Sequence, residues 1–386
     1  MINADNENIN ENKTVCIIGS GLSGLTCGMK LAKAGFNVTV VEELASPGGL
    51  LAYTRIGREY LELLPHHLRK SDKSLLALSK EMGVDDKITW YDSTWSGKAS
   101  HRKVGYYDVG FVCLVSSLMQ AITDHGGKIY FSTTVAEIAR LGSGMYRTSC
   151  ILSNSTRMVI DSAYVIFTGS CRTFINVSHG LPIAMDDRDI LMNVTYSAKI
   201  TAMMVMKHEI SQMFYQVPAE DYGLPFRSII NHSSAFGERG YGGAVVYLVG
   251  SCSITDPLWI SSDAEIMLKY FAGLRKLYPS LRKSDVKSWR LTKTRYALTL
   301  QYPEIDLTNP CENLYVCSTG LTKYATKDTP ENHMDSVVGL AGKISSEIIR
   351  SYEEMITRTS NPAPVTELTI QDSPVKNPSS IEGVLS

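Results

Sequence analysis

The 386-residue sequence has little excess charge and no long apolar run, and both deficits narrow the classes of function. Its 38 lysines and arginines are balanced by 39 acidic residues, so neither nucleic acid nor an anionic membrane surface is an expected partner. No stretch approaches about 20 uninterrupted apolar residues, which argues against a membrane span. Residues 1–12 are polar and acidic and match neither a signal peptide nor a transit peptide, so we expect a disordered tail there.

The eight cysteines lack the spacing of a metal site or a redox pair. They are scattered, none stands in a CxxC motif, and several lie within apolar runs. We therefore expect buried, reduced thiols, no metal site and a cytoplasmic protein. The length and the 44% hydrophobic content allow one large domain or two ordinary ones.

The stretch that says most about function lies near the start of the sequence. Residues 15–18 form a short β-branched run that ends in Gly19, Gly21 and Gly24, and apolar residues then recur at helical spacing from Leu22. Gly19 permits the turn out of the strand, Gly21 leaves room for a phosphate, and Gly24 allows the helix to pack closely on the sheet. Because glycine turns also close ordinary βα units, this fingerprint alone is weak evidence for a dinucleotide site.

A second strand strengthens the dinucleotide interpretation. Residues 38–41 are apolar and β-branched, and they end in Glu42, about 20 residues after the fingerprint. A carboxylate at this position accepts a hydrogen bond from a free ribose 2′-hydroxyl and repels a 2′-phosphate. The pyrophosphate is expected at the N-terminus of the intervening helix, where N–H groups are free and the dipole is positive.

A glycine pair after this strand, Gly48–Gly49, extends the pattern. GxGxxGL, a helix, VxVxE and a trailing GG together resemble the FAD-binding segment of amine oxidases, protoporphyrinogen oxidases, phytoene desaturases and UDP-galactopyranose mutases. Plain NAD dehydrogenases lack the trailing pair, so the resemblance favours FAD. The cofactor contacts that it implies in this segment are Gly19, Gly21, Leu22, Ser23, Gly24, Glu42, Glu43, Gly48, Gly49 and Leu50.

Two adjacent histidines, His66 and His67, are the first candidates for catalytic residues. The phrase from the glycine pair through HH and SD to GVDDKITW is similar to a bacterial subgroup of protoporphyrinogen-oxidase-like flavoproteins. In such proteins this segment passes the flavin, so the resemblance implies that both histidines lie near the isoalloxazine. The alternative is that they are packing and capping residues.

Later strands match further parts of the same families. The resemblance implies that Val135, after the GGKI strand, lies at the adenine end of FAD, and that Thr168 and Gly169 end a strand close to the cofactor. Simple sheet packing is the alternative for all three. The large helical insert that these families carry before GGKI is lacking, so we expect a shallower pocket or one completed by a partner protein or a second copy.

Residues 198–302 are β-rich and contain an amphipathic helix over 262–277, which predicts a mixed sheet with one covering helix. Amine oxidases carry a lysine that positions a water near flavin N5, and by that resemblance Lys293 is a third catalytic candidate. Because Lys293, Arg295 and Tyr296 share one strand, a solvated cationic face is the alternative. Asn231 and His232 fall where the resembling subgroup has a polar pair. A hydrogen-bonded structural role is the alternative for these two residues.

The closing segment is a strand that ends in Gly320, followed by a helix with an apolar side. In the resembling families this unit offers its helix N-terminus to the flavin, which implies cofactor contacts from Gly320, Asp335, Ser336 and Val337. A C-terminal helix that binds no ligand is the alternative. Beyond residue 355 the sequence is rich in proline and serine, and we expect it to be disordered.

Together these features predict an α/β protein in which a three-layer Rossmann-type FAD-binding domain with a parallel sheet is joined to a mixed β-sheet substrate domain. The expected boundaries are 13–54, 108–172 and 296–355 for the first domain, 55–107 and 173–295 for the second, with tails at 1–12 and 356–386. By resemblance, the function is hydride transfer from a C–N or C–C bond of a small molecule to FAD, with O2 or another acceptor reoxidising it. A non-redox flavoenzyme resembling UDP-galactopyranose mutase in polysaccharide or natural-product biosynthesis, and a flavoprotein accessory subunit, remain alternatives. A homodimer and a complex with a partner protein are both left open.

Overall fold

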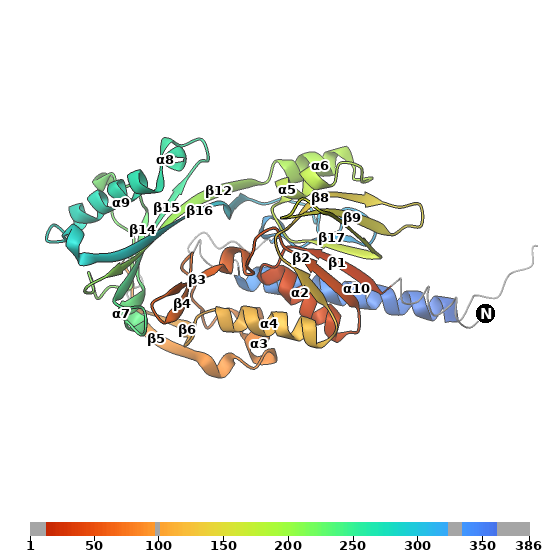
Figure 1. Ribbon diagram of the computed structural model, residues 1–386, viewed down its shortest axis with the longest axis horizontal. Coiled ribbons are helices and arrows are strands. Elements are labelled where there is room, and N and C mark those ends of the chain that lie inside the picture. Colours follow the sequence, from red (N-terminus) through yellow and green to blue (C-terminus); the bar gives the residue numbers. More distant parts are fainter. Residues whose placement is uncertain (1–12, 97–100, 323–333, 361–386) are drawn as a thin grey trace, which may run out of the picture.

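A computed structural model describes residues 13–96, 101–322 and 334–360 (Figure 1). The expected tail at 1–12 and residues 361–386 of the expected C-terminal tail lie outside these ranges. Two sheets of five strands each dominate the described chain. They lie at opposite ends of the molecule in Figure 1, and the long strands β12 and β16 run between the two ends.

The first sheet is parallel throughout, with strand order β17-β11-β1-β2-β7. Its strands are β1 (Thr14–Ile18), β2 (Asn37–Val41), β7 (Lys128–Tyr130), β11 (Tyr164–Phe167) and β17 (Leu314–Val316). The strand order reverses beside β1, because the chain builds outward first on one side and then on the other. In doubly wound folds, ligands bind at the carboxyl ends of the strands next to such a reversal.

Strand alternation explains the three layers. Val15 and Ile17 of β1 belong to a core with the helices α2 (Leu22–Lys33), α4 (Val112–Asp124) and α10 (Met334–Ser360). Cys16 and Ile18 point the other way, into a core with an antiparallel three-stranded sheet. That sheet consists of β8 (Thr133–Arg140), β9 (Tyr146–Leu152) and β10 (Arg157–Ser162). Successive residues face opposite sides of a strand, so β1 is buried on both faces.

The second sheet has the order β13-β14-β15-β12-β16. Its strands are β12 (Thr195–Met206), β13 (Tyr215–Gln216), β14 (Ser228–Asn231), β15 (Ala244–Cys252) and β16 (Val286–Gln301). All four ladders are antiparallel, and one parallel bridge between Trp95 and Tyr215 at the β13 edge makes the sheet mixed. The helix α9 (Asp263–Leu277) covers one face, as expected, and begins with a capping box between Ser262 and Glu265.

The remaining elements are short helices, hairpins and turns. The helices are α3 (Lys73–Glu81), α5 (Cys171–Val177), α6 (Met185–Met192), α7 (His232–Phe236) and α8 (Pro257–Ile260). The hairpin strands are β3 (Tyr53–Ile56), β4 (Glu59–Glu62), β5 (Ile88–Thr94) and β6 (His101–Tyr107). Short 3-10 turns occupy Gly49–Leu51, Asp85–Lys87, Glu220–Tyr222, Lys283–Asp285 and Thr319–Leu321. Only α4 lies between β6 and β7, which confirms that the large helical insert is lacking.

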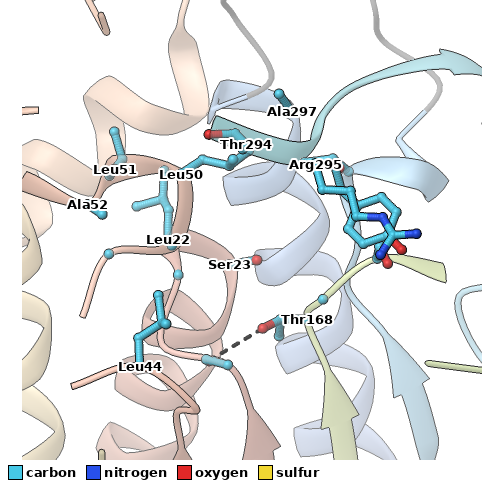
Figure 2. A pocket seen from close by; sticks show the side chains of 18 of the residues that line it. Leu22, Ser23, Leu44, Leu50, Leu51, Ala52, Thr168, Thr294, Arg295 and Ala297 are labelled. Atoms are coloured by element: carbon cyan, nitrogen blue, oxygen red, sulfur yellow. Dashed lines mark hydrogen bonds between the residues drawn. The ribbon is translucent and has the colours of Figure 1, made fainter. Parts of the chain in front are cut away.

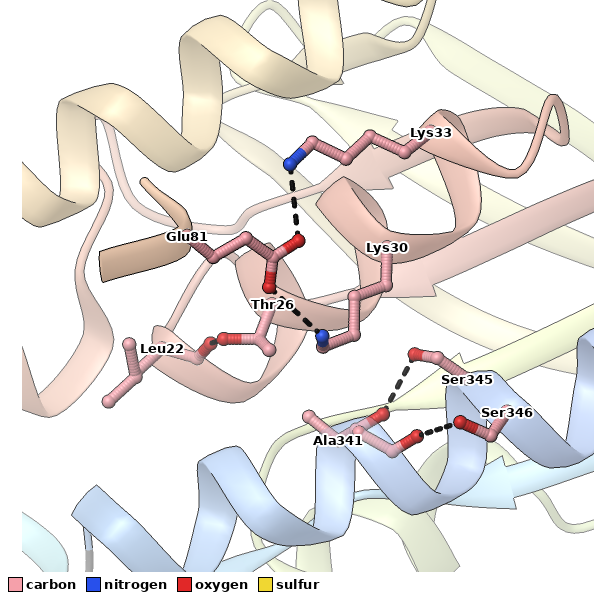
Figure 3. A network of polar contacts seen from close by, with 9 residues as sticks. Leu22, Thr26, Lys30, Lys33, Glu81, Ala341, Ser345 and Ser346 are labelled. Carbon is pink, nitrogen blue, oxygen red and sulfur yellow. Dashed lines mark hydrogen bonds and ion pairs between the residues drawn. The ribbon is translucent and has the colours of Figure 1, made fainter. Parts of the chain in front are cut away.

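Helix α3 is held against the first domain by polar contacts as well as packing. Glu81 pairs with Lys30 at 3.2 Å and with Lys33 at 3.1 Å (Figure 3). These ion pairs are about one-third exposed and contribute little stability. At the other end of α3, the Leu75 N–H donates to Asp335 Oδ1 of α10 at 2.8 Å, so a carboxylate from another helix caps the first turn.

Helix α10 is longer than expected. It continues to Ser360, although the tail was expected to start at residue 356. The reason is that Tyr352, Met355 and Ile356 extend the apolar side of the helix and pack on the main core. No helix in the described ranges is both long and apolar enough to cross a bilayer.

The packing of α9 on the second sheet yields a stability prediction. Leu274 is fully buried, whereas Leu268 on the same helix is 56% exposed. Leu274→Ala is expected to lower the free energy of unfolding by about 2–5 kcal/mol, because it leaves a cavity under the sheet. Leu268→Ala is expected to change it by less than about 0.5 kcal/mol. Urea unfolding of both variants measures the difference, and equal losses would contradict this packing.

Candidate cofactor and active site

The first glycine loop leads from β1 into α2. Gly19 has a φ of +107°, and its N–H donates to Val41 O at 2.8 Å. A Cβ at Gly19 would collide with Thr168 Oγ1, and one at Gly24 would collide with Gly19 O. Gly21 differs from both, since the nearest atom to an added Cβ would be 3.8 Å away. Two of the three glycines are therefore required by packing, and Gly21 leaves open space beside the start of α2.

The second glycine pair closes on the first loop. Gly48 and Gly49 have φ values of +115° and +57°, which favour glycine. The Gly48 N–H donates to Ser20 O at 3.0 Å, and Gly48 forms a parallel bridge with Gly21. An added Cβ at Gly49 would be 3.1 Å from Gly21 Cα. The two loops thus pack backbone against backbone at the N-terminus of α2, where no side chain caps the helix.

Glu42 fixes the position of both loops. Its Oε2 accepts hydrogen bonds from the Ser20 N–H at 2.7 Å and the Ser20 Oγ at 2.9 Å, and its Oε1 accepts one from the Leu44 N–H at 2.9 Å. The residue is buried, with 7% of its surface exposed. Each carboxylate oxygen can accept two hydrogen bonds, so Oε1 retains acceptor capacity for a ligand hydroxyl.

A cavity of about 610 Å³ begins at these loops and ends against the second sheet. This volume lies within the range of small-molecule sites. Figure 2 shows Leu22, Leu50 and Thr168 from the first domain in the same cavity as Thr294 and Arg295 of β16. The sequence-predicted residues that line it are Gly19, Gly21, Leu22, Ser23, Glu42, Glu43, Gly48, Gly49, Leu50, His66, Val135, Thr168, Gly169, Lys293 and Val337.

The adjacent histidines His66 and His67 have different surroundings. His66 lines the cavity, and its Nδ1 lies 2.8 Å from Leu64 O. Since a carbonyl oxygen can only accept, Nδ1 carries a proton, and Nε2 is the acceptor of the neutral ring. His67 instead stacks on Phe236 at 5.3 Å between ring centroids, and its Nε2 lies 3.3 Å from Nδ1 of His232. His67 therefore belongs to an aromatic cluster beside the cavity.

Four other sequence-predicted residues do not line the cavity in the described structure. Gly24 is needed for packing, and Asp335 caps α3. A Cβ at Gly320 would collide with Tyr196 and Cys171, so close packing explains this glycine, while its neighbour Thr319 does line the cavity. Ser336 follows Asp335 inside α10, and the cavity is lined by Met334 and Val337 of that helix.

The sequence analysis missed the side chains that β12 brings to the cavity. Lys199 is only 9% exposed and lines the wall opposite the glycine loops, together with Thr292 and Thr294 of β16. Arg295 was noted only as a neighbour of Lys293, yet it also lines the cavity. The available signal was Lys199 itself, the one charged residue of β12.

Lys293 takes part in the wall but has partners elsewhere. Its Nζ donates to Ser261 O at 2.7 Å and lies 3.9 Å from Asp263 Oδ1 at the start of α9. Its side chain is 27% exposed, which fits neither a fully solvated nor a buried group.

Behind the cavity wall lies a buried acid, Glu62, which no motif indicated. Tyr106 OH donates to its Oε2 at 2.6 Å, and the Phe111 N–H donates to its Oε1 at 2.7 Å. Burial raises the pKa of Glu62 to about 7, although both hydrogen bonds and the charge of Arg239 lower it. Burial also lowers the pKa of His232 to about 3. The aromatic cluster therefore holds two neutral histidines beside an acid that titrates near neutrality.

Comparison with known proteins agrees with this architecture. A model of an NAD(P)-binding Rossmann-like domain matches residues 17–81. Over 88% of this chain and 99% of the other, a structure described as a protoporphyrinogen oxidase from an Exiguobacterium species is 11% identical, with a TM-score of 0.73. Cyclohexylamine oxidase from Brevibacterium oxydans is 12% identical, with a TM-score of 0.68 over 88% and 99% of the chains. Putrescine oxidase bound to putrescine is 12% identical, with a TM-score of 0.67 over 87% and 99%.

These similarities confirm the expected fold class, a Rossmann-type domain joined to a mixed-sheet domain. The likeness covers almost the full length of each of these solved structures. At such low identity it shows the fold, so the site must be judged from its own residues.

Glu62 makes stability depend on pH. Its folded pKa of about 7 lies above the ordinary 4.5, so the folded state binds more protons between these values and stability falls as pH rises through them. The loss amounts to about 3 kcal/mol at most. Glu62→Gln removes the titration, so the stability of the variant relative to wild type is expected to improve steadily from pH 5 to pH 8. Urea unfolding across this range tests it, and a difference independent of pH would contradict it.

Proposed function

We propose that this protein is an FAD-dependent oxidoreductase that acts on a small molecule. The observation that carries the proposal is the single cavity that joins the glycine loops of a Rossmann-type domain to the face of a second sheet. A cofactor bound along the loops would present its far end to a substrate enclosed by β12 and β16. Similar folds in protoporphyrinogen oxidase, putrescine oxidase and cyclohexylamine oxidase support this arrangement.

The residues present fit a dinucleotide. The open side of Gly21 and the uncapped start of α2 suit a pyrophosphate, because free N–H groups and the helix dipole favour negative charge there. Glu42, at the end of β2, is placed to accept a hydrogen bond from the adenosine ribose. The other residues proposed to hold the cofactor are Gly19, Leu22, Ser23, Glu43, Gly48, Gly49, Leu50, Val135, Thr168, Gly169 and Val337.

FAD is preferred to NAD for two reasons. The trailing glycine pair, which the sequence shares with FAD-binding families, packs against Gly21 and forms part of the cavity. The cavity also continues past the expected pyrophosphate position to the second sheet, which leaves space for a flavin and a substrate. Glu42 does not distinguish the two cofactors, since both carry a free 2′-hydroxyl.

When bound, FAD would supply a two-electron acceptor for a hydride from a C–N or C–C bond, with O2 or another acceptor taking the electrons onward. The protein would bind and orient the substrate and exclude water. His66 lines the cavity and its Nε2 is the accepting nitrogen of the neutral ring, so His66 is the proposed base. Lys293 is proposed to hold the start of α9 against β16 through Ser261 and Asp263, and His67 to act by packing beside His66.

The lining of the cavity supports the alternative functions less well. A mutase that acts on a nucleotide sugar would need arginines to clamp a diphosphate, and Arg295 is the sole arginine among the described residues of the lining. An accessory subunit, or a site completed by a second copy or a partner protein, would show bound flavin but no turnover by the isolated chain.

Gly21 offers a test that separates cofactor binding from folding. Its φ of −70° and ψ of 178° suit any residue, and an added methyl group meets no atom closer than 3.8 Å. Gly21→Ala should therefore leave the thermal unfolding temperature of the cofactor-free protein unchanged. The methyl group would occupy the space of the pyrophosphate, so FAD affinity should fall about tenfold or more. Visible absorbance and chromatography of the released cofactor measure this.

Gly142→Ala is the matched control, because Gly142 is exposed and an added Cβ there meets nothing within 4 Å. It should retain FAD fully. A wild-type protein that neither carries nor takes up FAD would refute the proposal, as would a Gly21→Ala variant with unchanged affinity. Anaerobic bleaching of the flavin by a substrate would support an oxidoreductase, whereas activity only after dithionite reduction would indicate the mutase.

A further inference from the structure

Glu62 stands where β4 ends and the wall of the cavity begins. The next residues in the chain, Leu63, Leu64, Pro65 and His66, all line the cavity. Glu62 itself is 1% exposed and is not among the described residues of the lining. Because burying a carboxylate is costly, the partners of this carboxylate indicate what it keeps in place.

The Glu62 carboxylate caps helix α4 from another element. Its Oε1 accepts a hydrogen bond of 2.7 Å from the N–H of Phe111, the residue that precedes the helix. Its Oε2 accepts a hydrogen bond of 2.6 Å from Tyr106 OH on β6. The Phe111 side chain forms no capping hydrogen bond of its own. Since negative charge is favourable at a helix N-terminus, ionised Glu62 fixes the start of α4.

Phe111 links this cap to His66. The Phe111 side chain is fully buried, and its ring centroid lies 6.2 Å from that of His66 in an edge contact with an interplanar angle of 66°. The backbone of Glu62 provides a second link, because its carbonyl oxygen accepts a hydrogen bond of 2.7 Å from Tyr247 OH on β15. Glu62 thus fixes both the ring that packs on His66 and the start of the segment that carries it.

We infer that Glu62 is a positioning residue for His66, because its carboxylate holds Phe111 against the imidazole and its carbonyl oxygen ties the segment before the imidazole to the second sheet. The inference rests on the proposed function, in which His66 is the base, and specifies how that base is kept in place at the cavity. Glu62 acts through Phe111 and the backbone, not by contact with cofactor or substrate.

Ionisation of Glu62 changes the strength of this hold. Burial raises the pKa of Glu62 to about 7. Above that pH the Phe111 N–H donates to an ionised oxygen, and such charge-assisted hydrogen bonds are roughly twice as strong as neutral ones. The restraint on His66 therefore tightens as the pH rises through about 7.

Other titratable groups near Glu62 do not change charge in this range. The titratable and charged groups that face Glu62 from other elements are Tyr106 of β6, Cys113 of α4, Tyr247 of β15, and Arg239 and Tyr241 of the loop before β15. Burial raises the pKa of the three tyrosines and of the cysteine, so they stay neutral near pH 7. The arginine stays charged. A transition near pH 7 in this region therefore reports on Glu62.

Nuclear magnetic resonance tests the inference without substrate or turnover. The protein as purified is labelled with 15N at phenylalanine amides and with 13C in histidine rings, and it is titrated from pH 5 to pH 9. The signals of Phe111 and His66 are identified by their loss in Phe111→Leu and His66→Gln. The Phe111 amide should shift with a midpoint near pH 7, and the His66 ring should show a transition with that same midpoint. A Phe111 amide that shifts while His66 shows no such transition would overturn the inference.

Variants assign the shared transition to Glu62 and to the Phe111 ring. Glu62→Gln should abolish it in both signals, because the amide does not titrate. Phe111→Leu keeps the backbone N–H but removes the ring, so His66 should lose the shared transition. Glu59→Gln, the same substitution on the same strand, is the matched control and should leave both signals unchanged. A shared transition that persists in Glu62→Gln would overturn the assignment. The wild-type titration decides the question if a variant fails to fold.

The rate of flavin reduction gives a second measure once a substrate that bleaches the flavin is known. Glu62→Gln should lower the rate at saturating substrate about tenfold or more, because a misplaced base loses its alignment. Substrate affinity should stay unchanged, since Glu62 does not line the described cavity. An unchanged rate would overturn the positioning role.

Flavin content, measured on the same samples, keeps the two proposals apart. If the wild type contains no flavin and His66 still follows the Phe111 amide, the proposed function fails while the coupling of His66 to Glu62 stands. If the wild type carries flavin and His66 does not follow the Phe111 amide, the positioning role fails while the cofactor assignment stands.

Discussion

The structure of the site depends on one buried carboxylate. The Glu42 carboxylate accepts hydrogen bonds from the backbone N–H of Ser20 in the first glycine loop and from that of Leu44 in the loop after β2. Because Gly48 then bonds to Ser20 O, the second glycine pair is positioned against a loop that Glu42 already holds. The wall of the cavity at the N-terminus of α2 is thus set by hydrogen bonds of the protein itself. A site organised in this way pays little entropy when a ligand binds.

Much of the first domain could be predicted from the sequence because its signals are local. The turn after β1, from Gly19 to Gly24, and Glu42 combine a periodic pattern with glycines that close packing requires at positions 19 and 24. The glycine pair at 48–49 was equally visible, and the structure shows why no side chain is tolerated there. The helix expected over 262–277 agrees with α9, whereas the tail expected from residue 356 starts too early, because Tyr352 and Ile356 prolong the apolar side of α10.

The substrate side could be predicted less well because its contacts are not local. Two adjacent histidines look alike in a sequence, yet the side chain of His66 lines the cavity and that of His67 stacks on Phe236. Asp335 appeared to be a small residue at a cofactor site, whereas it caps a helix about 260 positions earlier in the chain. Lys199 acquires meaning only through its register with Thr294 on β16. These roles could be assigned only from contacts between segments that are distant in the sequence.

The aromatic cluster behind His66 adds a constraint on how the site can use protons. His67 and His232 are surrounded by rings, and burial holds the pKa of both below the ordinary value, so they remain neutral at pH 7. Glu62, bonded to Tyr106, is divided between its two protonation states near that pH. Because both histidines stay neutral, neither adds positive charge beside the cavity that His66 lines. Among these three residues, the charge that changes near neutral pH is therefore that of Glu62, which becomes more negative as the pH rises through about 7.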